Sequence, residues 1–309
     1  MNNTGPRVGR RSLLTGAAAT AAAAVVRGQG PAAPASPPAT TLADAALADN
    51  VAITIERRDD IVLIGINRTA LHNRLDGATR RRMGQVFYAY EHDPSLRAAV
   101  LFGHGDCFSR GIDVDAAQAS FQSGQPAADP TGTVDILGKA TPPPGKPVVA
   151  VVHGDTWNLG HEIYLACDVR VAAANTEFGQ DENTHGRFPG GGATVRFVRE
   201  AGWGNAMRYM LTGDHWTAEE SYRMGITQVV SPTPQAALEA GIAIAKKIAA
   251  AAPLSTRATL TSARHVTTPI EADALAKTNA VYAALYKTED FLEGRRAEAE
   301  GRPPRYRGK

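Results

Sequence analysis

Residues 147–152 read PVVAVV, and this is the most strand-like run in the chain. A short apolar run rich in β-branched residues is typical of a strand that is buried on both faces of a sheet. The pattern of residues 160–167 predicts a helix soon after it, and strand-like runs over 98–102 and 169–173 flank this unit. Strands that alternate with helices predict parallel βαβ pairing, in which ligands collect at the carboxyl ends of the strands.

The remaining segments predict an α/β fold that ends in helices. Residues 51–56 and 61–66 have the patterns of two strands joined by a turn, and a helix with one apolar face is expected from Asp76 through Tyr90. The polar stretch 113–143 is expected to be a mobile segment of the kind from which substrate lids are built. Alanine-rich periodic segments predict a C-terminal helical layer over residues 218–224, 236–251 and 270–286.

The composition is that of an ordinary soluble globular protein, with 43% hydrophobic and 21% charged residues among 309. The net charge is +2 and the basic residues are scattered, so nothing predicts a nucleic-acid partner. Cys107 and Cys167 are the only cysteines, which excludes a disulfide framework and falls short of a zinc site. Both are expected to be buried apolar groups, and a single bridge between them in an oxidising compartment stays open.

The N-terminal segment differs in kind from the rest of the chain. Arg10-Arg11 precedes an alanine-rich run over residues 16–26, and Ala33-Pro34-Ala35 offers small residues for cleavage. This order resembles a twin-arginine export signal, so residues 1–35 are predicted as an export signal and 36–50 as a linker. The apolar run is too short for a membrane span. The protein is expected in the periplasm or outside the cell if the signal is used, and in the cytoplasm otherwise.

Two turns that follow predicted strands carry the chemistry. Residues 108–113 follow the strand at 98–102, and residues 154–162 follow the strand at 147–152. Two adjacent strand-to-helix turns can aim backbone N–H groups at one point, an arrangement that stabilises negative charge on the oxygen of an enolate or a tetrahedral species. Either turn alone is weakly specific, but the motifs around them occur in a distinctive order.

These motifs are distributed along residues 51–309, the C-terminal five-sixths of the chain. They are Asn67-Arg68-Thr69 with Asn73-Arg74-Leu75, residues 107–113, residues 146–154, Glu162 with Ala166-Cys167-Asp168, residues 178–182 with Gly186, Pro189 and Gly190-Gly191, Leu211-Thr212-Gly213 with Ala218-Glu219-Glu220, and Gly225-Ile226. Together they resemble the crotonase, or enoyl-CoA hydratase/isomerase, superfamily over residues 51–309.

The resemblance implies a fold, an assembly and a substrate. The fold is α/β, a crotonase-like spiral of ββα units with its core at residues 51–230 and a C-terminal helical trimerisation region at 231–309. The implied assembly is a homotrimer or a dimer of trimers. The implied substrate is an acyl-CoA or a related small molecule of fatty acid metabolism, with no cofactor, because CoA is part of the substrate. No metal site is predicted, since the family needs none and no two histidines have tight ligand spacing.

The resemblance also assigns roles to residues. Ile112 and Leu159 correspond to the backbone donors of the oxyanion hole, and Glu162 and Glu182 correspond to the two catalytic glutamates of the hydratases. In such a lyase the carboxylates hold a water: one takes its proton as oxygen adds to Cβ, and the other helps to protonate Cα. The oxyanion hole holds the thioester enolate. The residues expected to contact the substrate are Ser109, Arg110, Gly111, Asp113, Trp157, Gly160 and His161.

The chain departs from the family pattern just before the first glutamate. Asn158-Leu159-Gly160 stands where most relatives carry consecutive glycines, and the loss of glycine restricts the backbone of this turn. Trp157 is bulky for its position, which indicates a smaller or differently shaped acyl pocket.

Two other functions stay open. Some superfamily members hydrolyse a C–C bond of cyclic β-diketones without CoA, using histidine and acidic groups, and His153, His161 and His185 fall in or near the predicted site. Each histidine can equally be a hydrogen-bonded structural residue, and this interpretation is favoured. Export would favour a CoA-independent enzyme, because CoA thioesters are chiefly cytoplasmic. The third function is that of an exported, non-catalytic small-molecule binder that kept the fold and lost turnover.

Overall fold

The structure is a computed structural model that describes residues 52–117 and 131–309. The predicted export signal and linker lie outside the described residues, as does the central part of the polar stretch 113–143. Within the described part, no helix is both long enough and apolar enough to cross a membrane.

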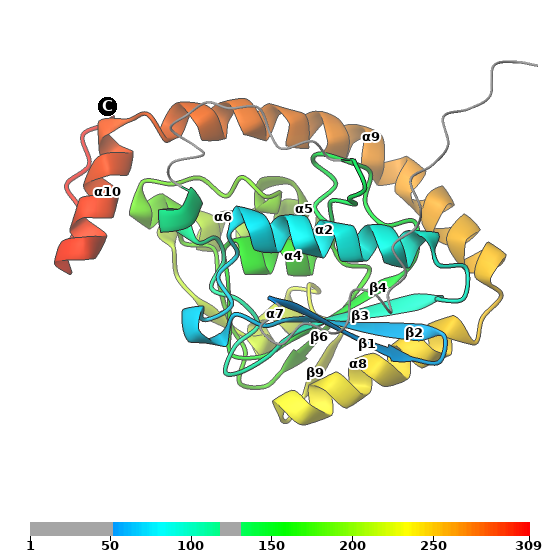
Figure 1. Ribbon diagram of the computed structural model, residues 1–309. Coiled ribbons are helices and arrows are strands. Elements are labelled where there is room, and N and C mark those ends of the chain that lie inside the picture. Colours follow the sequence, from blue (N-terminus) through cyan, green and yellow to red (C-terminus); the bar gives the residue numbers. More distant parts are fainter. Residues whose placement is uncertain (1–51, 118–130) are drawn as a thin grey trace, which may run out of the picture. The chain divides into compact units, whose positions relative to one another are not determined.

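A six-stranded sheet in the order β1-β2-β3-β4-β6-β9 forms the centre of the fold (Figure 1). Its strands are β1 (Ile53–Arg58), β2 (Ile61–Ile66), β3 (Ala98–Gly103), β4 (Val148–Val152), β6 (Val169–Ala173) and β9 (Val229–Ser231). The first two strands form an antiparallel hairpin, and each later strand pairs in parallel with its neighbour. The parallel pairing predicted from alternating strands and helices is confirmed, so the turns after β3 and β4 meet at one edge of the sheet.

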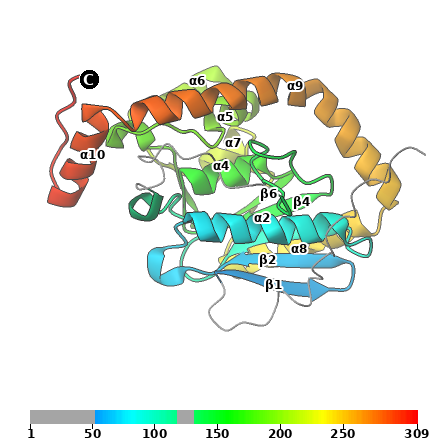
Figure 2. The ribbon, with the colours of Figure 1, turned by 45° about the horizontal axis from the view of Figure 1, so that its top comes forward.

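The sheet is buried on both faces because alternate residues point to different apolar layers. On β2, Val62 and Ile64 join the layer beneath α2 (Gly77–His92), whereas Ile61 and Leu63 join the layer against α8 (Pro234–Ala249). Figures 1 and 2 show these two helices on opposite faces of the sheet. Each fully buried Val, Ile or Leu side chain contributes about 1.5–3 kcal/mol, so burial fixes both the order and the register of the strands.

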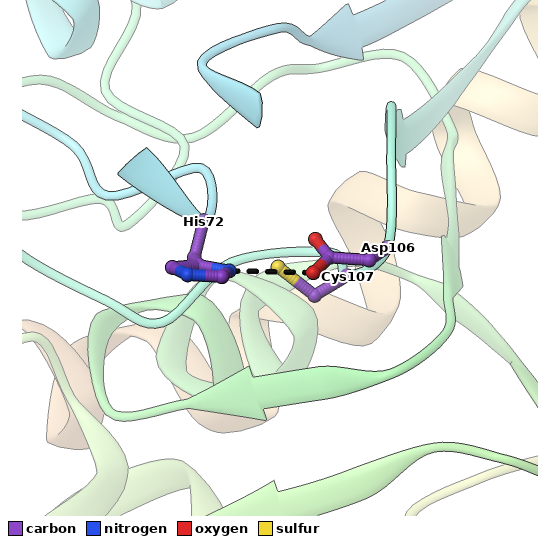
Figure 3. A group of neighbouring side chains, drawn as sticks. All are labelled: His72, Asp106 and Cys107. Atoms are coloured by element: carbon purple, nitrogen blue, oxygen red, sulfur yellow. Dashed lines mark ion pairs between the residues drawn. The ribbon is translucent and has the colours of Figure 1, made fainter. Parts of the chain in front are cut away.

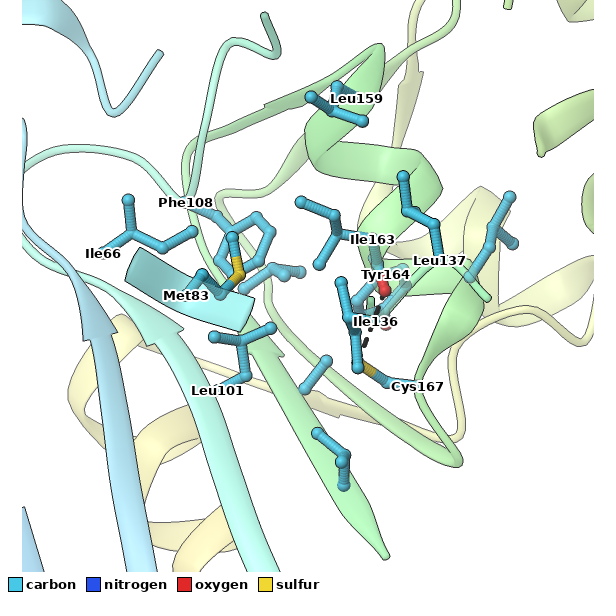
Figure 4. Packing of buried hydrophobic residues seen from close by; sticks show 14 of the residues in the cluster. Ile66, Met83, Leu101, Phe108, Ile136, Leu137, Leu159, Ile163, Tyr164 and Cys167 are labelled. Atoms are coloured by element: carbon cyan, nitrogen blue, oxygen red, sulfur yellow. Dashed lines mark hydrogen bonds between the residues drawn. The ribbon is translucent and has the colours of Figure 1, made fainter. Parts of the chain in front are cut away.

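Helix α4 (Leu159–Ala166) follows β4 and is buried in the layer on the α2 side. Ile163, Tyr164 and Leu165 belong to the same apolar cluster as Phe108 and Met83 (Figure 4). A helix of eight residues is marginal in isolation. Its position therefore depends on this packing, which also fixes the direction of the side chains in its first turn.

A second, three-stranded sheet lies outside the sequence-based prediction. It contains β5 (Asp155–Trp157), β7 (Glu177–Gly179) and β8 (Trp216–Thr217), with β5 parallel to β7 and β7 antiparallel to β8. Strands of two or three residues are too short to show a readable alternation. This small sheet positions the candidate site, because α4 begins just after β5 and Glu182 follows β7 closely.

The other helices follow these strands along the chain. They are η1 (Thr69–Leu71), η2 (Glu182–His185), α5 (Ala193–Ala201), α6 (Trp203–Thr212), α7 (Ala218–Arg223), α9 (Pro253–Leu285) and α10 (Glu289–Glu300). Helices α7 and α8 lie close to the predicted ranges, whereas α9 begins well before the predicted residue 270. Helix α9 packs on α5, where Glu271 pairs with Arg196 and Arg199.

Candidate active site

The turns after β3 and β4 lie side by side. The Trp157 amide donates to the Ser109 carbonyl over 2.9 Å, and the Ser109 amide donates to the Asp155 carbonyl over 3.1 Å. Gly111 also lies where the two turns meet: a Cβ there would be 3.2 Å from the Leu159 nitrogen, and its φ of +90° is one that side-chain-bearing residues rarely adopt. Glycine at this position therefore allows the two turns to meet.

The backbone amides of Ile112 and Leu159 lie at this junction, and neither has a hydrogen-bond acceptor among the described residues. The bridge between Ile112 and Leu75 uses the Gly111 carbonyl and the Asp113 amide, so the Ile112 amide points away from it. Leu159 is the first residue of α4, and the first amides of a helix lack partners within the helix. The structure thus places the two predicted oxyanion-hole residues on adjoining turns, and neither backbone donor is engaged within the described part of the chain.

Asn158, at a position where the family resemblance predicts glycine, adopts a backbone with a positive φ of 52° and a ψ of −118°. Such a conformation costs a residue with a side chain about 1–3 kcal/mol. Two hydrogen bonds offset this strain: the Asn158 side-chain amide donates to Asp181 over 2.8 Å, and the Asp181 amide donates back over 3.0 Å. The asparagine therefore keeps a glycine-like backbone and also ties the oxyanion turn to the turn that carries Glu182.

Replacing Asn158 by alanine is expected to lower the free energy of unfolding by about 2–4 kcal/mol, because the strain stays while both hydrogen bonds are lost. Asn158→Gly is expected to cost less, since glycine adopts this backbone freely. Urea unfolding of the two variants measures the difference. Equal stabilities would mean that the backbone at this position is unstrained.

Glu162 lies in the first turn of α4 and is only 2% exposed. Its Oε1 accepts the amide of Ala193 over 3.0 Å, and the backbone of Gly191 also bonds to the carboxylate. These donors come from the turn that begins α5, so the positive end of a second helix faces the carboxylate. Burial raises the pKa of Glu162 above its ordinary value, and the backbone donors limit that rise.

Two cations close to Glu162 carry no sequence signal that would have identified them. Lys139 donates through Nζ to the Gly190 carbonyl, and burial lowers the pKa of its ammonium group. Arg196 lies on α5 and donates to the Leu137 carbonyl over 2.6 Å. Both positive charges favour the ionised form of Glu162. Their positions follow from long-range packing, which spacing along the chain does not reveal.

Glu182 begins η2 and is 7% exposed. Both of its carboxylate oxygens accept from the Gln180 side-chain amide, over 2.9 and 3.0 Å. Burial raises the pKa of Glu182 well above its ordinary value, and the neighbouring charge of Glu162 raises it further. The structure therefore brings the two predicted glutamates together. Because two like charges that lie close together resist double ionisation, the negative charge of Glu162 favours a proton on Glu182.

Ser109 and Gly160, both predicted substrate contacts, build the wall of the site. The Ser109 hydroxyl is buried, donates to the Asn73 carbonyl over 2.8 Å and accepts the Gly111 amide over 3.1 Å. Gly160 lies so close that a Cβ would be 2.6 Å from the Ser109 carbonyl oxygen. In the described structure the serine hydroxyl is thus engaged in holding the turn.

Arg110, Trp157 and Asp113 are less buried than this wall. Arg110 pairs with Asp155 at 2.6 Å and lies over the Trp157 ring, 4.8 Å from its centroid. Asp113 pairs with Arg68 at 3.3 Å, which connects two of the motifs recognised in the sequence. These side chains are predicted to contact the substrate, and their partly exposed charges and ring are consistent with such contacts.

The three histidines of the predicted site have separate partners. His153 Nε2 lies 3.1 Å from a backbone carbonyl, and His185 Nε2 lies 3.5 Å from Asp181. His161 is wholly buried, with its Nδ1 2.7 Å from the Gln180 side-chain oxygen. Burial lowers the pKa of His161 to about 4, so its ring is neutral at physiological pH. Each histidine is therefore bonded within the protein, in agreement with the favoured structural interpretation.

A charged cluster around Asp181 holds the turn that carries Glu182. Burial opposes ionisation of Asp181, but hydrogen bonds from His185, His215 and Asn158 hold its pKa well below the ordinary value. His215 lies 3.3 Å from Asp181 and 2.8 Å from Glu177. The bond to Asp181 raises the pKa of His215 to about 9, so the imidazole is charged at neutral pH.

The stability of the protein is expected to fall as His215 loses its proton. Its pKa of about 9 in the folded state lies above the ordinary 6.5, so its contribution is complete below pH 6.5 and is lost as the pH rises toward 9. After allowance for solvent screening, the loss is on the order of 2 kcal/mol. His215→Gln should remove this part of the pH dependence of unfolding. An identical pH profile in the variant would contradict the expectation.

Only one group of described His, Cys, Asp or Glu side chains has donor atoms close enough to suggest a metal site: His72, Asp106 and Cys107, within 4.8 Å of one another (Figure 3). His72 Nδ1 lies 3.3 Å from Asp106, and the Cys107 thiol also bonds to this carboxylate. Burial raises the pKa of Cys107 to about 12. Both cysteines are free and buried, as expected.

A cavity of 340 Å³ lies away from the oxyanion turns, between α4, α5 and α9. Its charged lining groups pair with one another: Arg170 with Glu200, Arg196 with Glu271, and Arg264 with Asp168. Because these charges are already neutralised within the protein, the cavity lacks the convergent free polar groups of a substrate site. The buried glutamates and unpaired amides mark the better candidate.

Comparison with known proteins identifies the family of the chain. Residues 56–309 match the family described as Enoyl-CoA hydratase/isomerase. The chain is 33% identical over 260 residues to the enoyl-CoA hydratase EchA19 of Mycobacterium tuberculosis, covering 82% of this chain and 96% of that protein. It is 30% identical to the 2,3-dehydroadipyl-CoA hydratase of Escherichia coli, covering 83% and 99%. The crystal structure of a probable enoyl-CoA hydratase/isomerase from Mycobacterium abscessus is similar, with a TM-score of 0.68, 36% identity and coverage of 84% and 100%.

Proposed function

The chain belongs to the enoyl-CoA hydratase/isomerase family and is an enzyme of the hydratase type; from this premise we propose that it adds water to a 2-enoyl thioester through Glu162 and Glu182. The observation that carries the proposal is the pair of buried carboxylates beside the unpaired amides of Ile112 and Leu159. Carboxylates can move the protons of a water, while amides can hold a thioester oxygen that becomes negative.

The different surroundings of the two glutamates indicate which one acts as the base and which as the acid. Glu162 faces backbone donors and the charges of Lys139 and Arg196, all of which favour its ionised form. The charge of Glu162 in turn favours a proton on Glu182. Because burial raises the pKa of Glu162 less than the combined effects raise that of Glu182, we assign Glu162 as the base and Glu182 as the acid.

In the proposed reaction, Glu162 takes one proton and Glu182 gives one, so the protons balance. A water gives a proton to Glu162 while its oxygen forms a bond to Cβ of the enoyl thioester. The electron pair of the double bond moves toward the thioester carbonyl, whose oxygen is held by the amides of Ile112 and Leu159. Glu182 then gives its proton to Cα as the carbonyl forms again. Transfer of the proton gained by Glu162 back to Glu182 restores the starting state.

The carrier, the assembly and the location belong to the same proposal. CoA is the proposed carrier, because relatives such as the 2,3-dehydroadipyl-CoA hydratase of Escherichia coli are named for CoA esters. We propose a trimer assembled through the C-terminal helices, and export if the twin-arginine-like segment over residues 1–35 is used. Light scattering measures the assembly, and fractionation of source cells measures the location.

A panel of substrates tests the proposed reaction. The purified protein should hydrate at least one of a series of enoyl-CoA esters, followed by the loss of absorbance of the conjugated thioester, and should leave cyclic β-diketones intact. Cleavage of a diketone with no hydration of any ester would replace the proposal by C–C hydrolysis. Saturable binding of esters without product would indicate a binding protein.

A further inference from the structure

His161 is surrounded by aromatic rings and is connected through Gln180 to Glu182, the candidate acid. Its ring meets Phe178, Phe197 and Trp216 edge-on, with centroids 5.7, 5.1 and 5.0 Å away. Its Nε2 is buried and has no hydrogen-bond partner among the described residues, whereas its Nδ1 lies 2.7 Å from the Gln180 side-chain oxygen. The imidazole therefore has a single polar contact.

The Gln180 amide connects this contact to Glu182. Its oxygen faces His161, and its nitrogen lies 2.9 and 3.0 Å from the two oxygens of Glu182. An amide has one acceptor end and one donor end, and Glu182 offers an acceptor oxygen to the amide nitrogen both as a carboxylate and as the protonated acid. With its oxygen toward the ring, Gln180 needs a donor at His161 Nδ1, which places the single proton of the neutral imidazole on that nitrogen.

We infer that His161 is a positioning residue for Glu182: its Nδ1–H holds the Gln180 amide with the nitrogen toward the carboxylate. The inference depends on the proposed function in one respect only: it takes from it that Glu182 takes part in turnover. Without the Nδ1–H donor, the amide is free to turn its oxygen toward Glu182. An amide oxygen there accepts from the protonated acid and repels the carboxylate, so the reversed amide favours protonated Glu182.

Other charges around these groups act independently of the amide. Glu162 on α4 and the adjacent Asp181 both disfavour ionisation of Glu182, while Arg187 favours it. Arg170 is the charge whose field reaches His161. These interactions depend on distance and remain when the Gln180 amide reverses. A change in the pKa of Glu182 that requires Gln180 can therefore be separated from a general change in the electrostatic field.

The first test measures the tautomer of His161 in the unaltered protein by ¹⁵N NMR at pH 7. The expected spectrum is that of a neutral imidazole protonated on Nδ1. A ring protonated on Nε2, or a charged imidazolium, would overturn the inference. The measurement requires neither substrate nor a variant, so it is unaffected by a variant that fails to fold.

The second test compares His161→Phe with His161→Asn. Phenylalanine keeps a ring and removes the donor, whereas asparagine offers an N–H close to the position of Nδ1. The higher pKa of the carboxylate pair, followed by ¹³C NMR of labelled glutamate, should rise by about one in His161→Phe, a tenfold change in the proton equilibrium, and return toward the original value in His161→Asn.

Gln180→Leu provides the matched background. If His161 acts through the amide, His161→Phe should produce no further rise when Gln180 is already leucine. An equal rise in both backgrounds, or none in either, would overturn the inference. Because every readout is made without substrate, failure of the positioning role is distinguishable from failure of hydration: intact coupling with no turnover contradicts only the proposed function.

Discussion

Glutamine in place of either Glu162 or Glu182 is expected to lower kcat for hydration of a 2-enoyl thioester by about 10²- to 10⁴-fold. Glu162→Gln removes the base that takes a proton from water, and Glu182→Gln removes the acid that protonates Cα. The amide is nearly isosteric with the carboxylate, and it relieves the repulsion between two buried acids. The free energy of unfolding should therefore stay the same or increase in Glu182→Gln. It should decrease in Glu162→Gln, because the amide nitrogen cannot accept the backbone donors that the carboxylate accepts.

Initial rates at saturating substrate, with urea unfolding of the same preparations, measure the two effects. Glu200→Gln is the matched control, because this partly buried carboxylate pairs with Arg170 at 2.6 Å and lies outside the glutamate pair. It should lose stability and keep its kcat. Normal turnover in both active-site variants would contradict the assigned roles, and a loss of kcat that follows unfolding would make the glutamates structural. The double variant should fall little below the worse single one, because the two groups act as a unit.

The central sheet could be predicted because its strands are buried on both faces. β4 contains only valine and alanine, and a short, continuous apolar run bounded by turns is typical of a strand with both faces covered. The meeting of the two turns then follows from topology, since parallel neighbouring strands deliver their turns to the same edge, whereas the choice of Ile112 and Leu159 within those turns came from the family resemblance. The family motifs added the identity of the glutamates, which periodicity alone does not provide.

The surroundings of the glutamates could not be predicted, because they depend on contacts between distant segments. Lys139 precedes Glu162 in the sequence and Ala193 follows it, yet both interact with its carboxylate. Neither residue lies in a local sequence pattern that would identify it as a neighbour of Glu162. Gln180 was visible in a motif, but its bond to His161 depends on the small sheet whose strands are too short to recognise. The environments that assign acid and base are therefore tertiary properties.

Gly111→Ala is expected to lower kcat about ten- to a hundredfold and to destabilise the protein by about 1–3 kcal/mol. The added Cβ would lie 3.0 Å from the Asn158 Cβ, 3.1 Å from the Trp157 carbonyl oxygen and 3.2 Å from the Leu159 nitrogen. These contacts are tighter than ordinary packing, so the turn after β4 must yield by a few tenths of an ångström. Displacement of the Leu159 amide weakens its hold on an oxyanion more than on a neutral carbonyl oxygen, so the loss should fall on kcat.

Gly301→Ala separates backbone strain from displacement of the amide. Gly301 also has a positive φ, +64°, but a Cβ there meets nothing within 4 Å. Its alanine variant should therefore lose stability to a similar degree and keep its kcat, when both are compared by urea unfolding and by rates on the same thioester. A kcat for Gly111→Ala that equals the control's would mean that the Leu159 amide contributes nothing to the transition state. A large loss of kcat in Gly111→Ala alone would instead place the charge-stabilising donors at the junction of the two turns. There, the hydrogen bonds between Asn158 and Asp181 hold the turn that carries the Leu159 amide.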